Sequence, residues 1–205
     1  MLEFISKIYL WDKTSVATFL LIIFLLGILF GILAVGQLEV SSRQNLFTTI
    51  TGFMQGFSGL DYDRTVLMNE MTGIYYSSLL LLWILGISVL GIPLIFILIF
   101  IQGFAFGFTI AFMIMYFDLQ GFFLIMFAIL PQNLISIPVY LLAAVTASTF
   151  GWRIINFIRG QASLSPAIFL DYTLKMVLLA FFLFFSILIE VFVSPFVFER
   201  ILLYI

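Results

Sequence analysis

No charged residue occurs between Glu70 and Asp118, so residues 71–117 form an uncharged stretch of 47 residues. The hydrocarbon core of a bilayer is about 30 Å thick, and roughly 20 helical residues cross it. At about 1.5 Å per residue, one helix over this stretch would be roughly 70 Å long. The stretch is too long for one crossing, so the chain must turn within it.

The composition is that of a chain in a membrane. Apolar residues make up 64% of the 205 residues and charged residues only 9%, whereas a soluble domain has about 45–50% and about 25%. The apolar runs are long and do not alternate, which favours helices over the strands of a barrel. We therefore predict an all-α, polytopic integral membrane protein with a single transmembrane domain over residues 1–205.

The uncharged runs predict about five transmembrane helices. We place the turn of the long stretch at Gln102-Gly103, a pair of weak helix formers near its middle, and expect Pro93 to kink the preceding helix. We also expect a broken helix near Pro131; if that break is re-entrant, the chain has four or six crossings. The predicted helices cover residues 16–36, 76–101, 104–117, 120–145 and 174–195.

Basic residues suggest an orientation. They gather before the first predicted helix and after the fourth, at Lys7, Lys13, Arg153, Arg159 and Lys175. Lysine and arginine are enriched in cytoplasmic loops. We therefore predict a cytoplasmic N-terminus, an external C-terminus and an extracytoplasmic loop over residues 37–73.

The predicted external loop contains an amphipathic helix. Its apolar residues recur at spacings of three, four and seven, as expected for one helical face: Leu46, Phe47, Ile50, Phe53, Met54, Phe57 and Leu60. This face would lie at the membrane interface or against a partner protein. We select Phe47, Phe53 and Phe57 as the candidate partner-binding residues.

Two pairs of glycines are spaced for close helix packing. Gly27 and Gly31 form one such face, and Gly103 and Gly107 form the other. Small residues four apart let two helix backbones approach each other in lipid. We expect them to pack helices within the molecule; the alternative is formation of a homo-oligomer.

Polar residues interrupt the third uncharged run. Pro131, Gln132 and Asn133 combine a helix break with two amides, and Pro138 follows. Broken helices expose backbone groups to substrates in some transporters. We favour a structural break whose freed backbone groups are satisfied by Gln132 and Asn133.

Glu190 is the only carboxylate within a predicted membrane helix. We place it about one turn from the outward end of the last helix, before Pro195. There it could reach the interface, cap a helix, pair with Arg43 or Arg64, or contact a partner.

The residue inventory argues against catalysis and cofactors. The chain has no His and no Cys, and its net charge is −2 without any Lys/Arg-rich run. We predict no nucleophile–base pair, no cofactor and no nucleic-acid partner. Asp61, Asp63 and Glu70 could hold a divalent ion, but helix capping and solvation explain them more simply.

Three segments resemble the stage II sporulation protein M family: Leu81–Phe108, Leu130–Leu141 and Ile189–Pro195. The Leu-Pro-Gln-Asn element at residues 130–133, followed by Ile137-Pro138, is the most specific part. The resemblance implies a five-pass protein of the bacterial cytoplasmic membrane. It also implies partners resembling the stage II sporulation proteins D and P, which cleave septal peptidoglycan during engulfment.

We therefore expect a non-catalytic membrane anchor, or scaffold, of a peptidoglycan-remodelling complex that contacts lipid and cell-wall hydrolase subunits. The alternative is the transmembrane subunit of a transporter driven by a separate ATPase. In that case the break at residues 131–133 would line the substrate path, and residues 149–160 would couple to the ATPase.

Overall fold

Helices joined by short turns form the described part of the chain. The computed structural model describes residues 13–56 and 64–202, with side chains for residues 13–52 and 65–197. The elements are α2 (Lys13–Gly36), α3 (Val40–Gly56), α4 (Arg64–Ile87), α5 (Gly91–Leu124), the π-helical segment η1 (Ile125–Ile129), α6 (Leu130–Ile158) and α7 (Pro166–Leu202). No strand occurs over these residues, and the all-α membrane fold is confirmed.

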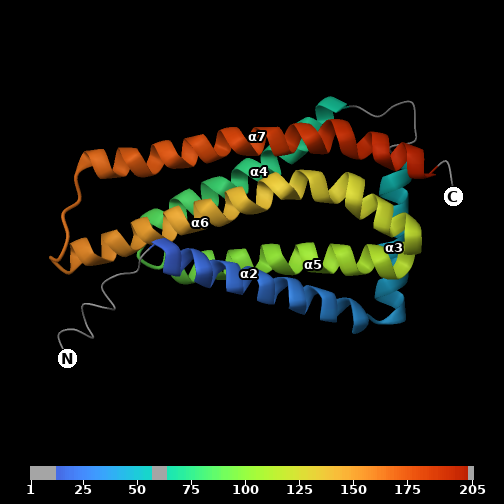
Figure 1. Cartoon of the computed structure of the whole chain (residues 1–205), viewed down its shortest axis with the longest axis horizontal. Coiled ribbons are helices and arrows are strands. Elements are labelled where there is room, and N and C mark those ends of the chain that lie inside the picture. The colour runs from blue at the N-terminus through green and yellow to red at the C-terminus, as the bar shows by residue number, and fades with distance from the viewer. Residues whose placement is uncertain (1–12, 57–63, 203–205) are drawn as a thin grey trace.

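The bundle contains five segments that can cross a membrane. Four helical spans are long and apolar enough, and the third of them, Gly91–Ile158, has 68 residues. Asp118, with φ 47°, interrupts its helical geometry, and α5 and α6 run side by side in opposite directions (Figure 1). The third span therefore has the length and the reversal of direction needed for two crossings.

The predicted turn at Gln102-Gly103 is wrong. Both residues lie inside α5, and the chain turns instead between α4 and α5, where the Gly91 amide donates to the Ser88 carbonyl at 3.0 Å. Pro93 does not kink a long helix, because it lies in the first turn of α5, where a missing N–H costs no helical hydrogen bond. The predicted helices over 76–101 and 104–117 are thus replaced by α4 and the first part of α5.

The predicted break at residues 131–133 is wrong, because these residues are helical and the departure from α-geometry lies just before them. The π-helical segment η1 ends one residue before α6, and Pro131 lies in the first turn of α6. The chain remains helical through this region and through Pro138. The irregularity is therefore a local change of helical pitch between two helices.

The glycine faces of α2 and α5 lie against each other. A Cβ at Gly31 would collide with the carbonyl oxygen of Phe104, and added atoms at Gly27, Gly103 and Gly107 would likewise meet backbone of the facing helix. All four glycines therefore serve packing within the molecule. This backbone contact fixes the separation of α2 and α5.

Helix α3 lies across one end of the bundle (Figure 1). Its Leu46 and Ile50 pack against a buried cluster that includes Val35, Phe112 and Phe117. We call this end the α3 end, and the opposite end, where α6 connects to α7, the α6–α7 end. The predicted amphipathic helix is present, and its apolar side partly covers the end of the bundle.

Gly31→Ala should lower the free energy of unfolding by about 1–3 kcal/mol, the usual cost of overpacking, because the new Cβ would meet backbone of α5. Gly36→Ala is the matched control in the same helix, since a Cβ added there would meet nothing within 4 Å. Unfolding of both purified variants in the same detergent checks the difference. Equal stability of Gly31→Ala and the parent protein would contradict the contact.

Candidate functional site

A pocket of about 500 Å³ lies among the crossing helices, with lining residues from α2, α4, α5, η1, α6 and α7. Gln102 lies 11 residues after the start of α5 at Gly91, and Thr109 lies nine residues before Asp118. At about 1.5 Å per residue, both lie roughly 14–16 Å from the nearer end of this crossing. The pocket is therefore at membrane depth.

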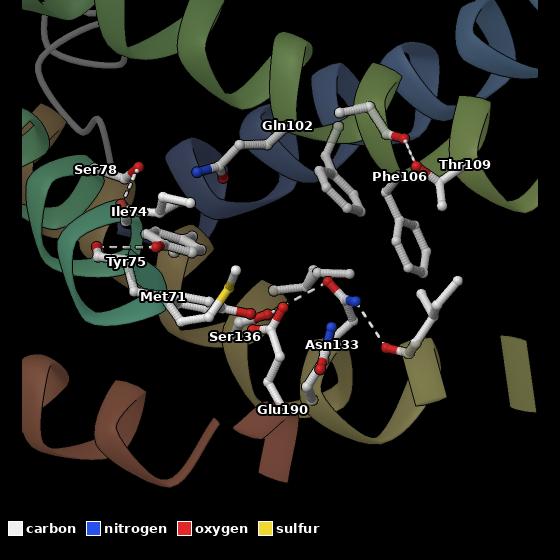
Figure 2. A pocket seen from close by; sticks show the side chains of 16 residues that line it. Met71, Ile74, Tyr75, Ser78, Gln102, Phe106, Thr109, Asn133, Ser136 and Glu190 are labelled. Atoms are coloured by element: carbon white, nitrogen blue, oxygen red, sulfur yellow. Dashed lines mark hydrogen bonds between the residues drawn. The ribbon is translucent and has the colours of Figure 1, made fainter. Parts of the chain in front are cut away.

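The pocket concentrates polar side chains in an otherwise apolar bundle. Figure 2 shows side chains from different helices facing one space. The polar lining includes Ser78, Gln102, Thr109, Gln132, Asn133 and Glu190. Polar groups at this depth are costly unless they find partners, so this pocket is the candidate functional site.

Glu190 projects into the pocket from α7. The side chains of Tyr75 and Gln132 lie close to its carboxyl group, while its Oε2 atom is buried without a hydrogen-bond partner. The sequence-based position one turn from the helix end is wrong, because α7 continues through Pro195 to Leu202.

Glu190 does not pair with Arg43, one of the partners considered from the sequence. The Arg43 Nε donates to the Leu38 carbonyl oxygen at 2.8 Å, in the turn between α2 and α3. The Arg64 side chain lies outside the described side chains.

Only one of the two amides predicted to satisfy freed backbone near Pro131, that of Asn133, binds a backbone group. Asn133 Nδ2 donates to the Ile129 carbonyl oxygen at 2.7 Å, at the end of η1. Gln132 Oε1 accepts a hydrogen bond from Ser194 Oγ at 3.2 Å. One amide thus acts within its own helix, and the other binds α7.

Two serines of α7, which were not predicted as site residues, bind the same irregular region. Ser194 Oγ donates to the Ala128 carbonyl oxygen at 3.0 Å, and Ser186 Oγ donates to the Gln132 carbonyl oxygen at 2.8 Å. Ser186, Glu190 and Ser194 are spaced four apart in an apolar helix, which places them on one face. This spacing is the sequence signal that could have identified the α7 side of the site.

Tyr140 joins α6 to α4 beside the pocket. Its hydroxyl donates to the Tyr75 carbonyl oxygen at 3.0 Å, and the two rings stack with centroids 6.2 Å apart. The pocket wall is therefore held by hydrogen bonds between helices rather than by apolar packing alone.

The predicted partner-binding face on α3 is only partly described. Phe47 stacks on Phe117 of α5, with ring centroids 5.1 Å apart, yet 39% of Phe47 remains exposed. The Phe53 side chain and all of Phe57 lie outside the described part of the structure. Phe47 thus anchors α3 while leaving part of its surface accessible.

Among the described residues, no three His, Cys, Asp or Glu side chains come close enough to hold a metal ion. Asp61 and Asp63, considered above with Glu70, lie outside those residues. The pocket instead combines one carboxylate with amides, hydroxyls and aromatic rings. These groups are suited to binding a small molecule.

Ser194→Ala should lower the free energy of unfolding by about 0.5–1.5 kcal/mol, because it removes a hydrogen bond between helices and leaves the Ala128 carbonyl without that donor. Ser77→Ala is the matched control, since this exposed hydroxyl donates only within its own helix, to the Ile74 carbonyl oxygen. Detergent-solubilised variants can be compared by thermal unfolding. Similar losses for both serines would contradict a special role of Ser194.

Comparison with known proteins shows which family the chain matches. The family model described as Stage II sporulation protein M matches residues 20–195. The match includes the glycine contact, the irregular segment around η1 and all residues lining the pocket. No curated protein and no solved structure gave a match.

Proposed function

The chain belongs to the stage II sporulation protein M family, and from this premise we propose that it is a membrane scaffold in sporulation. In this proposal it anchors a peptidoglycan-remodelling complex, as in engulfment, and has no catalytic role or cofactor of its own. Its partners are cell-wall hydrolase subunits resembling the stage II sporulation proteins D and P. The surrounding lipid is its other contact, and a homo-oligomer is compatible with this role.

The observation that supports a scaffold is the position of α3. This helix lies across the end of the bundle and exposes apolar side chains there, with Val40 75% and Phe47 39% exposed. Exposed apolar surface beside the membrane end is suited to contacts with another membrane-anchored protein. The proposed docking surface is the apolar side of α3 that begins at Phe47 and that the sequence pattern extends to Phe53.

The proposed orientation follows the basic residues. Lys13, Arg153 and Lys175 come from three helices and line one hollow together with Asp171, toward the end where α6 connects to α7. The positive-inside rule assigns this end to the cytoplasm. The α3 end and the C-terminus then face outward from the cytoplasmic membrane, toward the cell wall.

Single-cysteine labelling tests the orientation, because the natural chain has no Cys. Ser41→Cys on α3 should react with a membrane-impermeant maleimide in intact cells, whereas Ser163→Cys between α6 and α7 should react only after permeabilisation. Both serines are exposed. The opposite labelling pattern would reverse the proposed topology.

Phe53→Asp tests the docking surface. It should reduce the recovery of co-purified hydrolase subunits about thirtyfold, the size of a hot-spot loss, while membrane insertion is unchanged. Thr48→Asp is the matched control, because Thr48 is exposed and its hydroxyl donates to backbone of its own helix. Unchanged hydrolase recovery with Phe53→Asp would overturn this surface.

The pocket at membrane depth favours a second candidate function, the transmembrane subunit of a transporter driven by a separate ATPase. Substrate sites of many transporters lie near the bilayer midplane beside irregular helices. Purification from the native membrane in mild detergent separates the two roles. Hydrolase subunits among the partners support the scaffold, whereas a nucleotide-binding ATPase supports the transporter.

A further inference from the structure

We infer that the pocket around Glu190 is a binding site for a small organic ammonium compound, an amphiphile with a primary amine on an apolar body. The inference concerns the pocket alone and does not rest on the scaffold proposal. Four observations carry it: the unpartnered carboxyl oxygen, the aromatic lining, the volume and the position of the opening.

The charged residues of the pocket lining are acidic only. Glu190 is the only acidic residue in the lining, and no Lys or Arg belongs to it. Tyr75 and Gln132 are neutral neighbours of the Glu190 carboxyl group, while its Oε2 atom is buried without a hydrogen-bond partner. A buried carboxylate in a membrane protein needs a counter-charge or a donor. An ammonium group supplies both, with three N–H donors on one positive charge.

Aromatic rings complete a site for a cation. Phe24, Phe106, Tyr75 and Tyr140 line the same pocket as Glu190. Aromatic faces attract ammonium groups, and the attraction increases when the cation is removed from water. The same rings provide apolar surface for the body of the ligand. The lining therefore matches a ligand with one cationic end.

The volume limits the class of ligand. About 500 Å³ is within the roughly 300–1,000 Å³ typical of small-molecule sites. It is far more than a metal ion fills. A transmembrane helix of a partner, roughly 10–12 Å in diameter, could not enter a space bounded by all five crossing segments. A small organic molecule fits these limits.

The opening faces lipid. Ile74 on α4 and Ala105 on α5 are the two exposed residues of the lining, and both lie at membrane depth. A ligand that enters between α4 and α5 must first partition into the bilayer. This route selects amphiphilic amines over water-soluble ones, and the amine could belong to a free compound or to a lipid headgroup.

Binding of radiolabelled 2-phenylethylamine to the purified full-length protein tests the inference. We expect saturable binding that 2-phenylethanol, its neutral analogue, does not displace at equal concentration. Glu190→Gln should weaken binding at least about tenfold, because it removes a charge-assisted hydrogen bond. Glu39→Gln is the matched control, since Glu39 is exposed between α2 and α3 and outside the pocket.

A second measurement decides the matter if Glu190→Gln does not fold. Dicyclohexylcarbodiimide, an apolar reagent for carboxyl groups in membranes, should label Glu190 in the natural protein. The amine should slow this labelling, and 2-phenylethanol should not. Binding measured in nanodiscs with and without phosphatidylethanolamine separates the two sources of the amine. If phosphatidylethanolamine weakens binding of 2-phenylethylamine, the natural ligand is the lipid headgroup. If binding is equal in both nanodiscs, the natural ligand is a free amine.

Three results would overturn the inference. They are absence of saturable binding to the natural protein, full affinity in a folded Glu190→Gln variant, and carbodiimide labelling that the amine does not slow. One form of the third result is protection of Glu190 by a co-purified membrane protein, with none from the amine. That result would assign the pocket to a side chain of a partner.

Discussion

The backbone contact between α2 and α5 is the constraint on which the rest of the bundle depends. Between lipid-facing helices there is little hydrophobic driving force, so association depends on close packing and hydrogen bonds. Gly31 and its three counterparts let the two backbones touch. Because α5 is held along α2, its residues Gln102 and Thr109 are fixed at membrane depth, where they form one wall of the pocket.

The opposite wall depends on hydrogen bonds. The irregular segment η1 and the start of α6 present backbone carbonyls that Ser194 and Ser186 of α7 bind. In hydrocarbon an unsatisfied carbonyl is costly, so each irregularity needs a donor nearby. The polar face of α7 meets this need and also places Glu190 between the two serines. The same spacing that joins α7 to α6 therefore brings the carboxylate into the pocket.

Much of this fold follows from the sequence. The uncharged run after Glu70 requires at least two crossings, the glycine spacing indicates close packing, and the Pro131 region marks the irregular helix. The turn between α4 and α5 could not be located from the sequence. A glycine within an apolar run can mark a weak point of a helix, but it can also mark a contact between two helices in lipid. At Gly103 the tertiary contact with α2 outweighs the local weakness.

The depth of Glu190 shows a related limit. Proline often ends helices in soluble proteins, but within a membrane neighbouring helices and side chains satisfy the freed backbone groups. Helix α7 therefore continues past Pro195, and Glu190 lies well inside the membrane segment. The sequence showed that one carboxylate lay in an apolar helix. Only the arrangement of the other helices showed that a polar pocket surrounds it.

The apolar face of α3 has two roles, packing against α5 and the proposed docking of a partner. Phe117, one residue before the turn at Asp118, receives the ring of Phe47, so part of the apolar face of α3 is already used to hold α3 against the bundle. A partner can use only what remains exposed. Substitution of Phe47 would therefore disturb docking and the fold together. This is the physical reason to test recruitment at Phe53, where the amphipathic pattern continues beyond the contact with α5.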